Sequence, residues 1–125
     1  MNLFDEQNRP FIRFSDEYHY LYKKANRKIG LKKNSLLSFV THNCVFEKSK
    51  VLSMKDYFEK KNQINFFDLF INVYENNFYM ISEYDLYNSF ILEKFPEYKL
   101  KYWRGKNSTK EKLELNLYNY EYIAF

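Results

Sequence analysis

The sequence predicts a single compact α+β domain spanning residues 1–125, with about three helices and a mainly antiparallel sheet built from two hairpins. Three observations support this fold class. Dense aromatic and aliphatic runs flank the turn-forming Glu75-Asn76-Asn77, a helical segment is stopped by Pro96, and residues 97–104 alternate in polarity as a strand does. A chain of 125 residues is long enough to bury a core without disulfides or metals.

Residues 66–74 are expected to form a central strand. Apolar side chains occur at period two on both faces of this segment, which is typical of a strand buried on both sides. A helix across residues 64–74 fits the same letters at period 3.6. The strand is preferred because the segment is rich in aromatic and β-branched residues. Asn76 and Asn77 suit the tip of a hairpin, and residues 78–81 would return beside the first strand.

The first helix is expected to begin at Ser15 as its N-cap and to run to about Lys28. Gly30 follows as the residue that ends it, because glycine readily adopts the left-handed conformation that closes a helix. The preceding residues 1–10 are polar and are expected to form an irregular arm.

Two further helices are predicted from capping-box spacing, in which Ser is followed three residues later by an acid. Ser53 indicates a short helix over about 54–62, and Ser82 indicates one over about 83–95. Pro96 disfavours helical geometry in the residue before it and so ends the last helix.

The remaining strands are predicted over residues 11–14, 35–46 and 97–104, with a second hairpin over 113–123. In that hairpin Leu113, Leu115, Leu117 and Ile123 are expected to face one way, and the tyrosines at positions 118, 120 and 122 form a row on the other face. If the aliphatic face packs on the core, the tyrosines stand beside Trp103 and two lysines of residues 97–104. The candidate partner-binding residues are therefore Trp103, Tyr118, Tyr120, Tyr122, Lys99 and Lys101. The alternative is that a helix covers these tyrosines as part of the core.

The charge is unevenly distributed along the chain. The net charge is +4, with eight Lys and Arg against four Asp and Glu in residues 1–35 and one against five in residues 64–96. This polarity suits either intramolecular complementarity or a charged partner. The candidate basic patch consists of Lys23, Lys24, Arg27, Lys28, Lys32 and Lys33. It is either a solvated helix end that complements the helix dipole or a contact for phosphate or an acidic surface.

The composition excludes several classes of function. Gly30 and Gly105 are the only glycines and stand alone, so the chain has no Walker loop and no dinucleotide-binding turn. No cofactor is expected. The single cysteine, Cys44, excludes an internal disulfide, the first ten residues carry no secretory signal, and no run approaches the length of a membrane span. The protein is therefore expected to be cytoplasmic, with no membrane partner.

Catalytic and metal-binding candidates are few. His42 and Cys44 would share a face of a strand and His19 could join them, but a single cysteine is more often a small buried hydrophobe than a zinc ligand or a nucleophile. Asp85 with Glu97-Tyr98-Lys99 resembles the carboxylate and ExK arrangement of the restriction-endonuclease-like metal nucleases. That resemblance implies that the acids hold Mg²⁺ and that the lysine assists hydrolysis. A helix-capping role explains Asp85 equally and is favoured.

The leading functional hypothesis is a small non-enzymatic protein-binding module that occupies the surface of a partner protein. Phe, Tyr, Asn, Lys and Ile, all with AT-rich codons, make up half of the chain, which suggests an inhibitor or accessory factor of a phage, a mobile element or an AT-rich bacterium. The first alternative is a nucleic-acid-binding protein that uses the basic helix end and an aromatic and lysine-bearing sheet face. The second alternative is a small metal-dependent nuclease.

Overall fold

The computed structural model describes residues 2–15, 17–32, 37–41, 43–77, 80–102, 106–107 and 123–124. These residues form a mixed fold of four helices and two small two-stranded parallel sheets. The elements in chain order are β1 (Ile12–Phe14), α1 (Tyr20–Lys28), α2 (Lys48–Asn62), α3 (Phe66–Asn77), α4 (Glu83–Lys94), β2 (Leu100–Tyr102), β3 (Lys106–Asn107) and β4 (Ile123–Ala124). None of the helices in this part of the chain combines the length and the apolar content that crossing a bilayer requires.

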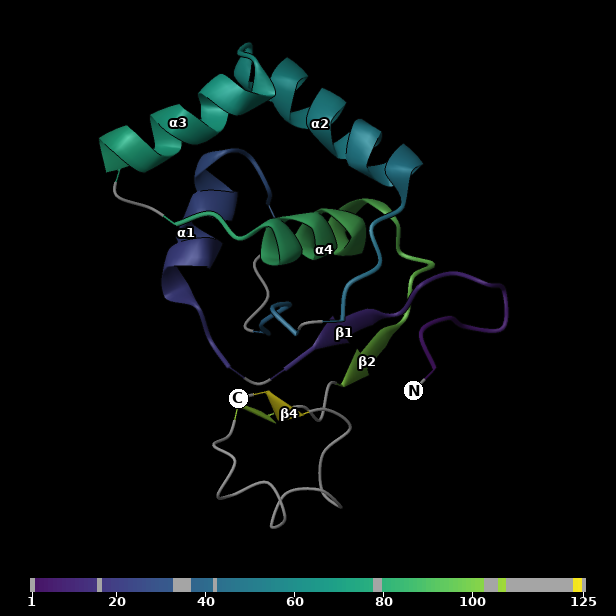
Figure 1. Ribbon diagram of the computed structural model, residues 1–125. Coiled ribbons are helices and arrows are strands. Elements are labelled where there is room, and N and C mark those ends of the chain that lie inside the picture. Colours follow the sequence, from purple (N-terminus) through teal and green to yellow (C-terminus); the bar gives the residue numbers. More distant parts are fainter. Residues whose placement is uncertain are drawn as a thin grey trace.

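The helices form two tiers (Figure 1). α2 and α3 meet at a corner at the top of the view, and α1 and α4 lie beneath them, above β1 and β2. α4 packs against both α1 and α2, whereas α3 packs against α2. α4 is therefore the central helix of the fold.

The predicted antiparallel sheet of two hairpins is not supported by the described residues. β1 pairs with β2 in parallel, with Ile12 opposite Leu100, and β3 also pairs with β4 in parallel. β1 and β2 come from distant parts of the sequence with all four helices between them, and such a crossover allows parallel pairing that a hairpin cannot make. The strand predicted over residues 11–14 is confirmed as β1. Of the strand predicted over 97–104, residues 100–102 form β2, and residues 103 and 104 lie outside the described part of the chain.

The strand predicted over residues 35–46 is wrong for the part of it that the structure describes. Residues 37–41 and 43–46 contain one isolated bridge, between Ser38 and Ser15, and no strand. The predicted hairpin over 113–123 lies almost wholly outside the described residues.

The predicted central strand over residues 66–74 is helix α3, the competing interpretation of the same letters. Asn65 and Glu59 satisfy the unpaired N–H groups at its start: Phe67 N donates to Asn65 Oδ1 and Phe66 N to Glu59 Oε2, both at 2.9 Å. Leu69 and Val73, one turn apart, are buried, with Phe66 and Phe70 packed against the core beside them. A strand would have required burial of both faces, whereas the helix buries only this one.

The prediction for α4 is confirmed. Ser82 caps it, since its Oγ accepts a hydrogen bond from Asp85 N at 3.4 Å, and the helix ends two residues before Pro96. α2 begins at Lys48, five residues before the predicted cap, and Ser53 lies within the helix and donates from its Oγ to Ser49 O.

α1 begins after His19 and not after Ser15, whose backbone instead pairs with that of Ser38. The helix ends as predicted at Gly30, which has φ of +119° and lies so close to α2 that a Cβ would be 2.5 Å from Lys61 Cδ.

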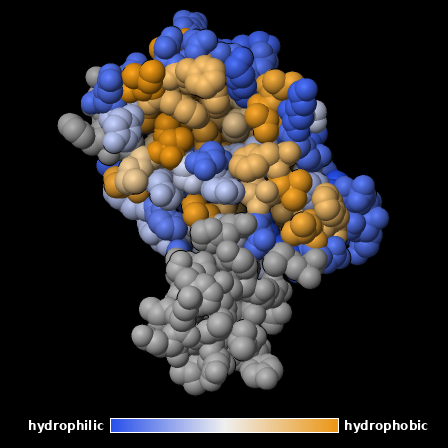
Figure 2. Space-filling model, in the orientation of Figure 1, coloured by the Kyte–Doolittle hydropathy of each residue, from blue (hydrophilic) through white to orange (hydrophobic). Residues whose placement is uncertain are grey.

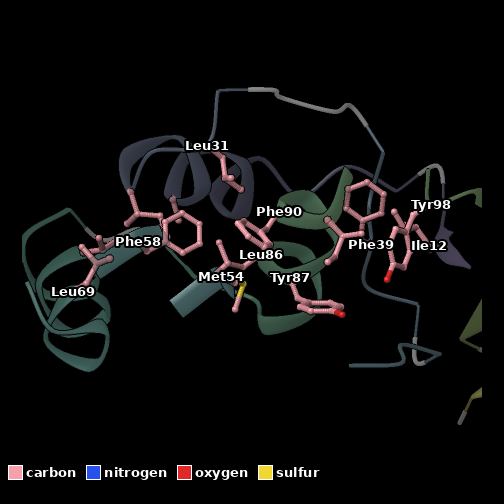
Figure 3. Packing of buried hydrophobic residues seen from close by; sticks show 14 residues of the cluster. Ile12, Leu31, Phe39, Met54, Phe58, Leu69, Leu86, Tyr87, Phe90 and Tyr98 are labelled. Atoms are coloured by element: carbon pink, nitrogen blue, oxygen red, sulfur yellow. The ribbon is translucent and has the colours of Figure 1, made fainter. Parts of the chain in front are cut away.

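The hydrophobic core follows α4 (Figure 3). Leu86 and Phe90 of α4 lie at its middle, Phe58 and Leu69 lie toward one end, and Tyr98 lies at the other. The buried members are Ile12, Ala25, Ile29, Leu31, Phe39, Met54, Phe58, Leu69, Val73, Leu86, Tyr87, Phe90, Ile91 and Tyr98.

A buried polar cluster lies within this core, centred on the fully buried carboxylate of Asp85. Its Oδ1 accepts hydrogen bonds from Lys23 Nζ at 2.9 Å and from Phe39 N at 3.2 Å, and its Oδ2 accepts one from Asn26 Nδ2 at 2.8 Å. The Lys23 ammonium also lies 4.6 Å from the centre of the Phe39 ring. One carboxylate therefore joins α4 to α1 and to the segment over residues 37–41.

We expect Asp85→Asn to lower the free energy of unfolding by about 3–5 kcal/mol, because it leaves the Lys23 ammonium buried without a counter-charge. The matched control is Asp56→Asn on the surface of α2, where Lys60 Nζ and Asp56 Oδ2 are also 2.9 Å apart but both side chains are exposed. That control should leave stability nearly unchanged, since solvent screens exposed pairs. Urea unfolding measures both, and equal effects of the two substitutions would contradict the role given to Asp85.

Candidate functional site

The outward side of α3 carries large apolar side chains that the fold does not cover. Phe67 is 69% exposed, Ile71 54% and Tyr74 67%, although the opposite side of the same helix is buried. Their spacing of four and three residues places them in one row along the helix. Figure 2 shows apolar patches among hydrophilic residues on the upper half of the described surface, where α2 and α3 lie. Contiguous exposed apolar surface of this kind is typical of an interaction site.

A groove lies at the C-terminal end of this row. Its volume is about 370 Å³, and its lining is mostly apolar. Met80, in the segment that leads into α4, is 47% exposed and forms part of the wall. The lining residues are Phe70, Ile71, Tyr74, Glu75, Met80 and Ile81.

The charge around this surface is negative. Asp68 and Glu75 are exposed on α3, and Glu83 is exposed at the start of α4. The sequence has no Lys or Arg between residues 62 and 93. The α3 face, defined here as Phe67, Ile71 and Tyr74 with Asp68 and Glu75, therefore combines apolar side chains with an acidic border.

The predicted partner-binding residues are only partly described. Trp103, Tyr118, Tyr120 and Tyr122 lie outside the described residues. Lys99 forms an exposed ion pair with Glu6 at 3.3 Å, and the Lys101 ammonium lies 5.1 Å from the centre of the Phe11 ring. Both lysines therefore contact the N-terminal segment.

The predicted basic patch is divided by the structure. Lys23 is buried against Asp85, so it is not part of any surface patch. Lys24, Arg27 and Lys28 lie together with Tyr20 around a hollow on the outer side of α1. Lys32 is exposed beyond Gly30 and its backbone N donates to Glu93 Oε1, and Lys33 lies outside the described residues.

The geometry does not favour the predicted metal-nuclease residues. Both carboxylate oxygens of Asp85 accept hydrogen bonds from protein groups in the core, whereas Glu97 and Lys99 are exposed. Within the described ranges, no group of three or more His, Cys, Asp and Glu side chains is placed to hold a metal ion. His42 lies outside these ranges, and His19 Nδ1 lies 2.9 Å from Ser38 Oγ.

Three titratable groups on or beside α4, Cys44, Tyr87 and Tyr98, are held in their neutral forms. Burial raises the pKa of the Cys44 thiol to about 11, against a smaller lowering by its hydrogen bond from Asn88 Nδ2. Burial also raises the pKa of Tyr87 to about 12 and that of Tyr98 above its ordinary range, and the Tyr98 hydroxyl donates to Glu47 Oε1. Their hydrogen bonds link α4 and Tyr98 to the segment that leads into α2, and none of the three groups is an activated nucleophile at neutral pH.

Sequence reasoning missed the α3 face, and one available signal indicates it. Asn65 is a good N-cap directly before residues 66–77, and a helix from there separates Leu69 and Val73 from Phe67, Ile71 and Tyr74.

We expect Cys44 to react slowly with iodoacetamide in the folded protein. Its pKa rises from 9.0 to about 11 on folding, so at pH 9 the thiolate fraction is about 50-fold smaller than in the urea-unfolded chain. Because the unfolded state loses its proton first, this thiol also lowers the stability of the fold as pH rises from about 9 to 11. Labelling followed by mass spectrometry from pH 7 to 11 measures the rate, and a plateau near pH 9 in the folded protein would contradict the burial of this thiol.

Comparisons with protein-family models, with curated proteins and with solved structures found no match to this chain. The chemistry of its own surfaces is therefore the basis on which a function is proposed.

Proposed function

We propose that this protein is a non-enzymatic binding module that holds a partner protein on the α3 face. The single observation that supports this is the exposure of Phe67, Ile71 and Tyr74 on a helix whose other side packs on the core through the buried Leu69 and Val73. Large side chains left in water are unfavourable for an isolated domain, and covering them on association recovers about 25 cal/mol for each Å² of apolar surface.

The shape and charge of the face favour one kind of occupant, an amphipathic helix with Lys or Arg beside its apolar stripe. An apolar row along a helix with a groove at its end is the surface that helix-in-groove recognition uses. The border formed by Asp68 and Glu75 attracts cationic side chains and repels acidic ones, which orients the partner. The module acts sterically, as an inhibitor or accessory factor does when it covers a surface of its target.

Two other functions have weaker support. A metal-dependent nuclease would need Asp85 at an accessible position, and this carboxylate is buried in an ion pair. A sheet face that stacks bases would depend on Trp103 and Tyr118 to Tyr122, which lie outside the described residues.

We expect a designed 18-residue peptide of leucine and lysine at helical spacing to bind the protein, and one with glutamate in place of lysine to bind far more weakly. Ile71→Ser should weaken binding of the lysine peptide by about tenfold or more, because the side chain lies in the middle of the apolar row. The matched control is Leu52→Ser on α2, where the side chain is 55% exposed against 54% for Ile71. Isothermal titration calorimetry measures the affinities.

Three outcomes would contradict the proposal. The two peptides could bind equally well, Leu52→Ser could weaken binding as much as Ile71→Ser, or sedimentation could show a dimer that Ile71→Ser dissociates. The last result would assign the α3 face to a second copy of this chain and not to a different protein.

A further inference from the structure

α1 presents a second exposed surface whose charge is opposite to that of the α3 face. Tyr20, Lys24, Arg27 and Lys28 follow the spacing i, i+4, i+7 and i+8, so they share one side of the helix. The other side is buried against α4 through the Lys23 and Asn26 bonds to Asp85. The four outward residues line a hollow of about 310 Å³.

One aromatic ring, that of Tyr20, lines this hollow, and the ring of Tyr18 lies next to it. The rings of Tyr18 and Tyr20 are 6.4 Å apart between centroids, and these side chains are 47% and 55% exposed. The Lys24 ammonium lies 5.1 Å from the centre of the Tyr20 ring. Two adjacent exposed rings beside cationic groups are the arrangement on which unpaired bases stack in proteins that bind single strands.

Two of the cations that line this hollow are Arg27 and Lys28. Within the described part of the chain, no carboxylate is in ion-pair contact with Arg27 or Lys28. The acid nearest in sequence to the tyrosines, Glu17, faces His19, with 3.7 Å between Oε2 and Nε2. Asp85 is neutralised inside the core by Lys23. Among the described residues, the positive charges of Arg27 and Lys28 therefore lack a paired carboxylate.

We propose that this surface, Tyr18, Tyr20, Lys24, Arg27 and Lys28, binds single-stranded nucleic acid. Arg27 and Lys28 contact successive phosphates of the strand. The tyrosine rings stack against unpaired bases of the same strand. A duplex offers the same phosphates but keeps its bases inside the helix, so the exposed rings contribute to binding only when the strand is single. This activity uses a different helix from the proposed protein-binding site and does not depend on that site.

Fluorescence anisotropy with a labelled 12-nucleotide oligothymidine tests the proposal in the full chain. We expect binding at low salt that weakens as salt rises, and weaker binding to a duplex of equal length. The double variant Arg27→Gln with Lys28→Gln should lower affinity by about tenfold or more. It should also reduce the slope of log affinity against log salt by about 1.4, since each lost phosphate contact on a single strand removes about 0.7.

The matched control removes two positive charges from α2 through Lys48→Gln and Lys60→Gln, both exposed lysines. It should leave the affinity and the slope nearly unchanged. Tyr20→Ala should weaken binding by about fivefold or more, whereas Tyr20→Phe keeps the ring and should bind as the parent does. Circular dichroism checks that each variant is folded.

The proposal is overturned if no salt-dependent binding is seen at 50 mM salt, if the duplex binds as tightly as the single strand, or if the α2 control weakens binding as much as the α1 variant. Full competition by thymidine monophosphate at equal concentration would also overturn it, because the site would then take a mononucleotide and not a strand. Ile71→Ser, which removes the α3 face, should not alter oligonucleotide affinity.

Discussion

The burial of the Asp85 carboxylate is the constraint on which the rest of the structure depends. Moving a carboxylate out of water is expensive unless hydrogen bonds and an opposite charge replace its hydration. Here Lys23, Asn26 and the backbone of Phe39 supply them. These partners come from α1 and from the segment over residues 37–41, so satisfying one side chain fixes both segments against α4.

That constraint also determines which charges remain at the surface. The Asp85 interaction draws Lys23 inward, and it leaves Lys24, Arg27 and Lys28 on the outer side of α1. α3 packs on α2, at the corner seen in Figure 1, and its outer side keeps Asp68 and Glu75 among exposed apolar residues. The basic N-terminal third of the sequence and its acidic central segment therefore appear in the structure as a basic surface on α1 and an acidic border on α3.

The sequence predicted the ends of helices correctly where the local capping and stop signals were strong and no tertiary contact overrode them. Ser82, the aspartate three residues later and Pro96 delimit α4 closely, and Gly30 marks the end of α1. The pairing of β1 with β2 could not be predicted, because it joins residues almost ninety positions apart and no local pattern specifies it. The role of Asp85 was also hidden. Its spacing from Ser82 indicates a cap, and only the tertiary contact with Lys23 turns it into a core residue.

The failure at α3 is informative about function. Apolar residues at period two on both faces made residues 66–74 look like a strand buried on both sides, because that pattern normally means that both faces are covered. In the helix the same residues divide differently, and Phe67, Ile71 and Tyr74 are exposed while Leu69 and Val73 are buried. A sequence pattern that disagrees with the burial of the isolated chain is expected where a partner completes the burial. The mistaken element and the proposed binding face are therefore the same residues.

Site-specific photocrosslinking in the native host is the most direct test of the central claim that the α3 face holds a partner protein. A photoreactive amino acid would replace Ile71 in one variant and Leu52, equally exposed on α2, in the other. We predict one discrete adduct from position 71 and none from position 52, with the crosslinked peptide lying in an amphipathic segment rich in Lys or Arg. Absence of an adduct at position 71, or the same adducts from both positions, would contradict it.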